Sequence, residues 1–126
     1  MRITIETIAH KDQRYPTVGD WQWDASGNLK ISVSDMGDWR YEALVALHEL
    51  AEVLICKHDG VNQADVDRFD MDYEEHRMEG DDSEPGDSPE APYNRQHCIA
   101  TGIERIMAAE LGVGWKAYDD TVMSLP

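Results

Sequence analysis

Two side chains one helical turn apart are the clearest sign of chemistry in this sequence. His48 and Glu52 occupy positions i and i+4 of a segment with helical periodicity, so both project from one side of the expected helix. On a helical wheel they lie beside an apolar arc that includes Leu44 and Leu54. A half-buried carboxylate is destabilising unless it is paired or metal-bound, so the charge of Glu52 needs compensation. We expect either a structural hydrogen-bonded pair with His48 or a cation that both side chains bind.

A second pair of candidate ligands lies further along the chain. His97 and Glu104 are seven residues apart, which places them two turns apart and almost in line on a helix. If this helix packs against the first, its two side chains meet His48 and Glu52. Two imidazoles with one or two carboxylates suit Zn²⁺, Mn²⁺ or Fe²⁺. We therefore predict one divalent metal site with His48, Glu52 and His97 as ligands and Glu104 in reserve.

Each member of this second pair also has a structural alternative. His97 comes close to the expected start of its helix, where its ring could bond a backbone carbonyl. Glu104 could form an exposed ion pair with a basic residue instead of reaching a metal. The convergence of the two helices decides between these alternatives.

The strands that precede the first helix are short. Residues 1–36 contain two stretches in which apolar and polar side chains alternate, Arg2–Ala9 and Leu29–Val33. This period of two predicts strands, and turn-forming residues between them predict a small N-terminal antiparallel sheet. Strands first and helices afterwards indicate an α+β class, in a single domain that spans residues 1–126.

Three main helices are expected after the strands. Helix-start residues, apolar periodicity and glycine stops place them at residues 38–57, 62–77 and 93–111. Residues 79–92 are rich in Pro, Gly, Ser and acidic side chains, which predicts an exposed acidic loop. The loop joins the second helix to the third, so it lies near the expected metal ligands.

The net charge of −15, from 26 acidic and 11 basic residues, restricts the partners. It repels nucleic acid and anionic membranes, so we expect no direct nucleic-acid binding and no membrane association. It favours cations and basic protein partners, although solubility alone is an alternative explanation. The two cysteines form no CxxC pair, and the N-terminus has no apolar signal core. We expect a cytoplasmic protein of a bacterium or of a phage-infected host cell.

The first helix resembles the active-site helix of zincin metallopeptidases. A strand, Leu29–Val33, leads into a helix that carries the sequence His48-Glu49-Leu50-Ala51-Glu52, and the zincin motif is HExxH. The resemblance implies that His48 is a metal ligand and that Glu49 is the general base that activates a metal-bound water. The second histidine of the motif is replaced by Glu52, whose carboxylate is also a zinc ligand type.

The same resemblance extends to the downstream helix. It implies a further ligand there, a place for His97 or Glu104, and an oxyanion-stabilising role for Tyr93. The function that follows is a zincin-like, metal-dependent hydrolase with a peptide or protein substrate. Walker, GxSxG and GxGxxG motifs are missing, so phosphate-loop and serine-hydrolase chemistry lack support.

Two functions other than this hydrolase are consistent with the sequence. The first is a non-enzymatic acidic interaction protein, a DNA mimic or anti-defence inhibitor that binds a basic protein partner; His48 and Glu52 would then be structural. The second is an HD-like phosphohydrolase, because the helix around His48 also resembles the metal-binding helix of that family. Glu49 replaces the aspartate of the HD pair.

Overall fold

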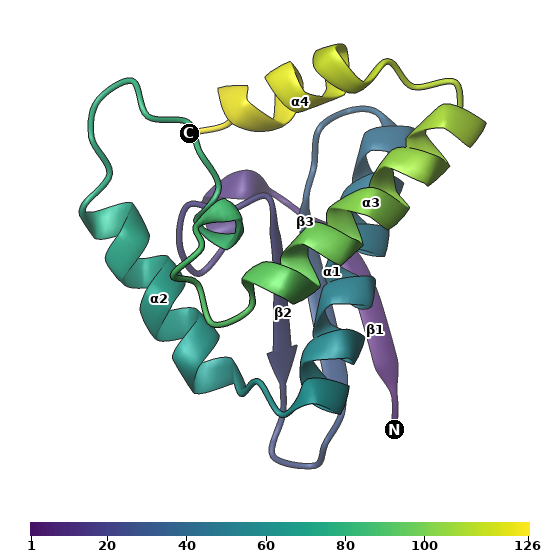
Figure 1. The fold of residues 1–126 in the computed structure, drawn as a ribbon. Helices are drawn as coiled ribbons and strands as arrows, with labels where there is room; N and C mark the ends of the chain where they lie inside the picture. The colour runs from purple at the N-terminus through teal and green to yellow at the C-terminus, as the bar shows by residue number, and fades with distance from the viewer.

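Three short strands form a mixed sheet at the N-terminus (Figure 1). In the computed structural model, which describes residues 1–126, they are β1 (Ile3–Ile8), β2 (Gly19–Trp23) and β3 (Leu29–Ser34). β3 lies in the middle, antiparallel to β2 and parallel to β1. The expected all-antiparallel sheet is therefore wrong at the β1–β3 pair. The connection from residue 9 to 18 is long enough to step over one strand position, which lets β3 enter between β1 and β2.

Four helices follow the sheet, so the predicted α+β class is confirmed. α1 (Trp39–Asp59) begins at Asp38, whose carboxylate accepts a hydrogen bond from the backbone N–H of Arg40. It ends at Gly60, which has the left-handed φ of 79° that favours glycine. The remaining helices are α2 (Gln63–Glu75), α3 (Asn94–Glu110) and α4 (Trp115–Ser124). α4 is an addition to the three main helices predicted from the sequence.

α1 covers one face of the sheet and joins it to the rest of the core. Leu29, Ile31 and Val33 alternate along β3, and all three are buried. They share one apolar cluster with Leu44 and Val53 of α1. This packing fixes the rotation of α1, so the side of the helix that carries His48 and Glu52 is turned toward α3.

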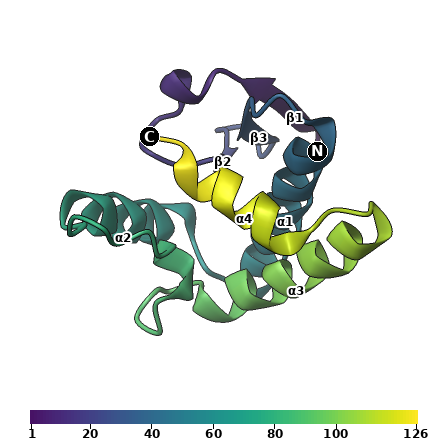
Figure 2. The same ribbon diagram turned by 90° about the horizontal axis from the view of Figure 1, so that it is seen from above.

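α3 and α4 complete the packing around α1 (Figure 2). α3 lies along α1, and α4 crosses above the first turns of α1, where the rings of Tyr41 and Tyr118 pack edge to face with centroids 5.2 Å apart. α2 stands apart, and residues 79–92 connect it to α3 through a short 3₁₀ turn, η2 (Pro85–Asp87). None of the helices combines the length and apolar character that crossing a bilayer requires.

Candidate metal centre

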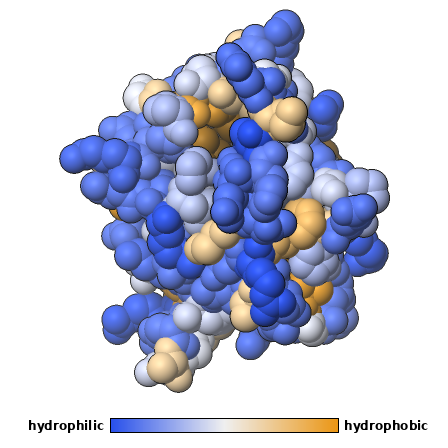
Figure 3. Space-filling view, turned by 90° about the vertical axis from the view of Figure 1, so that its left-hand side faces the viewer, coloured by the Kyte–Doolittle hydropathy of each residue, from blue (hydrophilic) through white to orange (hydrophobic).

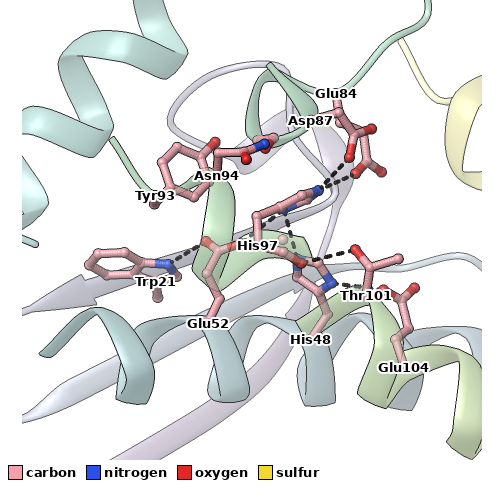
Figure 4. A network of polar contacts seen from close by, with 12 residues as sticks. Trp21, His48, Glu52, Glu84, Asp87, Tyr93, Asn94, His97, Thr101 and Glu104 are labelled. Carbon is pink, nitrogen blue, oxygen red and sulfur yellow. Dashed lines mark hydrogen bonds and ion pairs between the residues drawn. The ribbon is translucent and has the colours of Figure 1, made fainter. Parts of the chain in front are cut away.

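Three buried side chains from α1 and α3 meet between these helices (Figure 4). His48 and Glu52 come from α1, and His97 comes from the first turn of α3. Their exposed fractions are only 7%, 4% and 5%. The predicted convergence of His48, Glu52 and His97 is thus present in the structure, and all three side chains are largely buried.

The three facing atoms form a nearly equilateral triangle. His48 Nε2 lies 3.1 Å from Glu52 Oε2 and 3.1 Å from His97 Nδ1, and the last two atoms are 3.0 Å apart. Three ligands of a tetrahedral zinc ion, each about 2.0–2.1 Å from the metal, are about 3.3 Å apart. If the three atoms moved slightly apart, they would therefore occupy three of the four corners of a tetrahedral site.

A second layer of polar contacts holds the outer atoms of these three residues (Figure 4). Glu104 Oε1 lies 2.8 Å from His48 Nδ1, and Glu104 Oε2 accepts a hydrogen bond from the Tyr118 hydroxyl at 2.6 Å. The indole N–H of Trp21 donates to Glu52 Oε1 at 2.9 Å. Such outer contacts orient metal ligands and set the tautomer of a ligating histidine.

His97 is held in the same way by the acidic loop. Its Nε2 lies 3.0 Å from Glu84 Oε2 and 3.1 Å from Asp87 Oδ1. The loop approaches so closely that a Cβ on Gly86 would fall 2.4 Å from Cγ of the His97 ring. Only glycine fits at this position without displacement of the ring.

The positions of the protons show why this cluster attracts a cation. The carboxylates beside His48 Nδ1 and His97 Nε2 place the proton of each neutral imidazole on those outer nitrogens. The inner nitrogens then present lone pairs to each other and to the carboxylate oxygen of Glu52. Three acceptors at about 3 Å repel one another unless positive charge lies between them. Both a proton and a metal ion meet this need.

The pKa values of the cluster report strong mutual attraction between its histidines and its carboxylates. Burial alone would lower the pKa of His97, but its contacts with Glu52 and Glu84 outweigh burial and raise the pKa to about 10. Burial opposes the charge of Glu52 too, yet the two histidines lower its pKa to about 2. The pKa of His48 is raised well above its ordinary value by Glu104 and Glu52, against the effect of burial.

Glu49 is placed differently from the triangle. Its side chain lines the same cavity as His48, and its Cγ and Oε1 pack against Gly19, where an added Cβ would fall 2.8 Å from each. Burial and the nearby charge of Glu52 raise the pKa of Glu49 well above its ordinary value. A carboxyl group with a raised pKa holds its proton more tightly than an ordinary carboxylate does, which is a property of general acid–base groups.

The other two predicted site residues lie behind the cluster. Glu104 Oε1 contacts Nδ1, the outer nitrogen of His48, so Glu104 contributes none of the three converging atoms. The hydroxyl of Tyr93 donates to Asp70 at 2.5 Å, and the carboxylate of Asp70 also accepts from Tyr15 at 3.0 Å. The side chain of Tyr93 approaches His97 through its ring, with centroids 6.1 Å apart, and its backbone carbonyl accepts a hydrogen bond from the backbone N–H of His97 at 2.9 Å.

Several residues that contact the cluster were not predicted from the sequence. Trp21, Glu84, Asp87 and Tyr118 come from a strand, the acidic loop and α4, and no local pattern links them to α1. The one usable signal was the Glu-Pro-Gly-Asp sequence at residues 84–87, which favours a tight turn. That turn is η2, the segment that contacts His97.

A cavity of about 620 Å³ opens beside the cluster, a size typical of small-molecule sites. Its walls come from β2 and the connection before it, from the acidic loop and from α4. No protein-family model, curated protein or solved structure matches this chain. The function is therefore inferred from the geometry of the cluster and its cavity.

Proposed function

We propose that the protein is a metal-dependent hydrolase with one divalent ion, preferably zinc and otherwise Mn²⁺ or Fe²⁺. The ligand atoms would be His48 Nε2, Glu52 Oε2 and His97 Nδ1. The observation that carries this proposal is the convergence of three acceptor atoms at 3.0–3.1 Å in a buried place, each on a side chain whose outer atom is held by another residue.

Different residues would have different roles in this reaction. An ion held by two histidines and one carboxylate would supply Lewis acidity to a hydrolytic reaction. Glu49 lines the cavity and holds a proton more tightly than an ordinary carboxylate, which suits it as the proton acceptor and donor of a hydrolytic step. Glu104 fixes the ring of His48, and Trp21 fixes the carboxylate of Glu52.

The peptide or protein substrate rests on the resemblance to zincins, through His48, Glu49 and the preceding strand. Glu104 and Tyr93 keep their predicted roles only if they move, because each now bonds a group outside the three-atom triangle. A cytoplasmic location stays part of the proposal, and the two free cysteines, Cys56 and Cys98, support it.

Elemental analysis of the purified, untagged protein tests the metal site directly. We expect about one zinc, manganese or iron per chain in the wild type and none in His48→Ala. His76→Ala is the matched control, because His76 also lies near two carboxylates, but on the surface of α2. Equal metal content in wild type and His48→Ala, or no metal in either after reconstitution, would contradict the proposal.

The acidic interaction protein remains a second candidate because of one observation. The face that carries α2 and the acidic loop is dominated by hydrophilic residues, with small apolar areas between them (Figure 3). A protein of this kind would bind a basic protein with a steep dependence on salt and would need no metal. The HD-like phosphohydrolase stays a third prediction, which the same metal analysis followed by phosphatase assays would test.

A further inference from the structure

The carboxylates that line the cavity fall into two groups. One group is neutralised by arginine: Asp20 and Asp67 both pair with Arg14, at 2.8 and 3.1 Å. Glu74 pairs with Arg77 at 2.7 Å in the same manner. These carboxylates are satisfied within the protein and have no need of a ligand.

The second group has no cationic partner. Glu49, Asp82 and Asp119 line the cavity, and none of the ion pairs of the protein involves them. They come from α1, the acidic loop and α4, so they surround the cavity from three elements. Burial and the neighbouring charges of Glu84 and other carboxylates raise the pKa of Asp119, which shows that negative charge is crowded on this side.

Neither arginine that lines the cavity forms an ion pair with Glu49, Asp82 or Asp119. Arg77 also donates to the backbone carbonyl of Asp81 at 2.6 Å, and the guanidinium of Arg105 lies over the Trp115 ring, 4.4 Å from its centroid. Apolar side chains of the C-terminal segment, Val122, Met123 and Leu125, line the same cavity. A ligand with an aliphatic stem and a positive end matches both kinds of wall.

We infer that the cavity beside the His48–Glu52–His97 cluster binds a peptide segment that carries lysine or arginine side chains, with Asp82 and Asp119 as specificity-determining residues. The inference rests on the proposed hydrolase and names its substrate class. The cationic end of such a side chain would lie between the acidic loop and α4, and its stem would lie against the apolar residues of the C-terminal segment. The peptide backbone would then lie beside the three-atom triangle.

Peptide binding can be measured through the tryptophans, because Trp21 and Trp115 line the cavity. The probes are a short, acetylated and amidated peptide with two lysines, its counterpart with two glutamines, and spermidine. We expect the lysine peptide to bind at least about tenfold more tightly at low salt, with the difference shrinking as salt is added. Mass spectrometry of the peptide after each titration shows whether it stayed intact.

A pair of matched double variants tests the assignment of residues. Asp82→Asn with Asp119→Asn should weaken binding of the lysine peptide about tenfold, which corresponds to about 1.4 kcal/mol, since both substitutions remove a charge that attracts the lysine ammonium group. Glu75→Gln with Glu110→Gln removes the same charge from acidic residues outside the cavity and should change binding less than about twofold. Circular dichroism checks that both variants are folded.

The outcomes separate the substrate class from the metal site. Equal affinity for the lysine and glutamine peptides, or equal weakening in the two double variants, overturns the inference. Spermidine binding as tight as that of the lysine peptide overturns the peptide assignment and indicates a free polycation. Metal content measured on the same samples is independent: one metal per chain without charge discrimination refutes only the substrate class, and discrimination without metal refutes only the hydrolase.

Discussion

Two separate regions of the molecule bring histidine and carboxylate atoms within reach of one ion, and they differ in burial and in the contacts around them. One is the buried cluster of His48, Glu52 and His97. The other is the surface cluster of Asp72, Glu75 and His76 at the end of α2. A third group, Glu84 and Asp87 with His97, adjoins the first region because it shares His97. In the surface cluster the side chains of His76 and Asp72 are 72% and 70% exposed, and His76 Nδ1 bonds the backbone carbonyl of Asp72 at 2.9 Å.

The difference shows that residue types alone do not define a metal site. At the surface, water solvates each carboxylate, and His76 forms a hydrogen bond with a backbone carbonyl of α2. The ion pair of His76 with Asp72 therefore contributes little to stability. Between α1 and α3 the side chains are largely buried, and the contacts of Glu104 with His48 and of Trp21 with Glu52 fix both ligands from behind. Burial and outer contacts turn similar chemistry into a constrained geometry.

The largest difference in activity should be between variants of Glu49, next to the buried cluster, and Glu75, in the surface cluster. Glu49→Gln should lower hydrolytic activity about 10²–10⁴-fold, the usual loss when a general acid–base group is removed, while metal content stays unchanged. Glu75→Gln should leave both unchanged. Activity is measured on the lysine-containing peptide, with metal analysis of the same sample. Full activity in Glu49→Gln would exclude it as the base.

Removal of a histidine is the next test of the comparison. His97→Ala should weaken zinc binding more than about 100-fold, because a ligand affects affinity more than the outer contacts that support it. His76→Ala should have no effect. Competition with a chromophoric chelator gives both affinities. Similar values for the two variants would remove the distinction between the buried and the surface cluster.

An outer contact should have a smaller effect. Tyr118→Phe removes the hydroxyl that holds Glu104 behind His48, and we expect about 10–100-fold weaker metal binding. Tyr73→Phe is the control, since the Tyr73 hydroxyl contacts only Ser83 near the surface cluster. Unchanged affinity in Tyr118→Phe would show that α4 does not support the site.

The pH dependence of stability tests the buried cluster in the absence of metal. In the folded, metal-free protein the pKa of His97 is about 10 against an ordinary 6.5, so its stabilising contribution is complete below pH 6.5 and lost as the pH rises toward 10. For Glu52 the pKa is about 2 against 4.5, so its contribution is present above pH 4.5 and lost as the pH falls toward 2. We expect maximal stability between about pH 4.5 and 6.5.

Urea unfolding of the chelated protein at pH 6 and pH 9 measures this change. The free energy of unfolding should be a few kcal/mol lower at pH 9, and His76→Ala should keep the same profile because its ring is solvated. With saturating zinc the direction should reverse, because metal binding requires deprotonated ligands and strengthens as the pH rises. The same slope with and without zinc would indicate that the cluster does not bind the ion.

Local periodicity explains what the sequence could predict. The i, i+4 spacing of His48 and Glu52 and the seven-residue spacing of His97 and Glu104 are properties of single helices, and the caps at Asp38 and Gly60 mark the ends of α1. The α+β class followed from the order of strands and helices. The meeting of His97 with the first pair required only that two amphipathic helices pack together.

What the sequence could not predict depends on contacts between distant segments. The parallel pairing of β1 with β3 is a matter of topology, and alternation of side chains is the same in parallel and antiparallel strands. The contact of Glu84 with His97 joins a segment that composition marks only as an exposed loop to a buried ring. Composition describes how a loop is solvated on average and gives no information on a single inward side chain.

The glycine at residue 86 has a consequence for the rate at which an ion could be exchanged. η2 lies against the His97 ring with no room for a methyl group, so the turn covers one side of the cluster. An ion bound at the three facing atoms would be shielded by this turn on the His97 side, so it would enter and leave through the cavity beside the cluster. A ligand that fills the cavity should therefore slow the removal of the metal by a chelator.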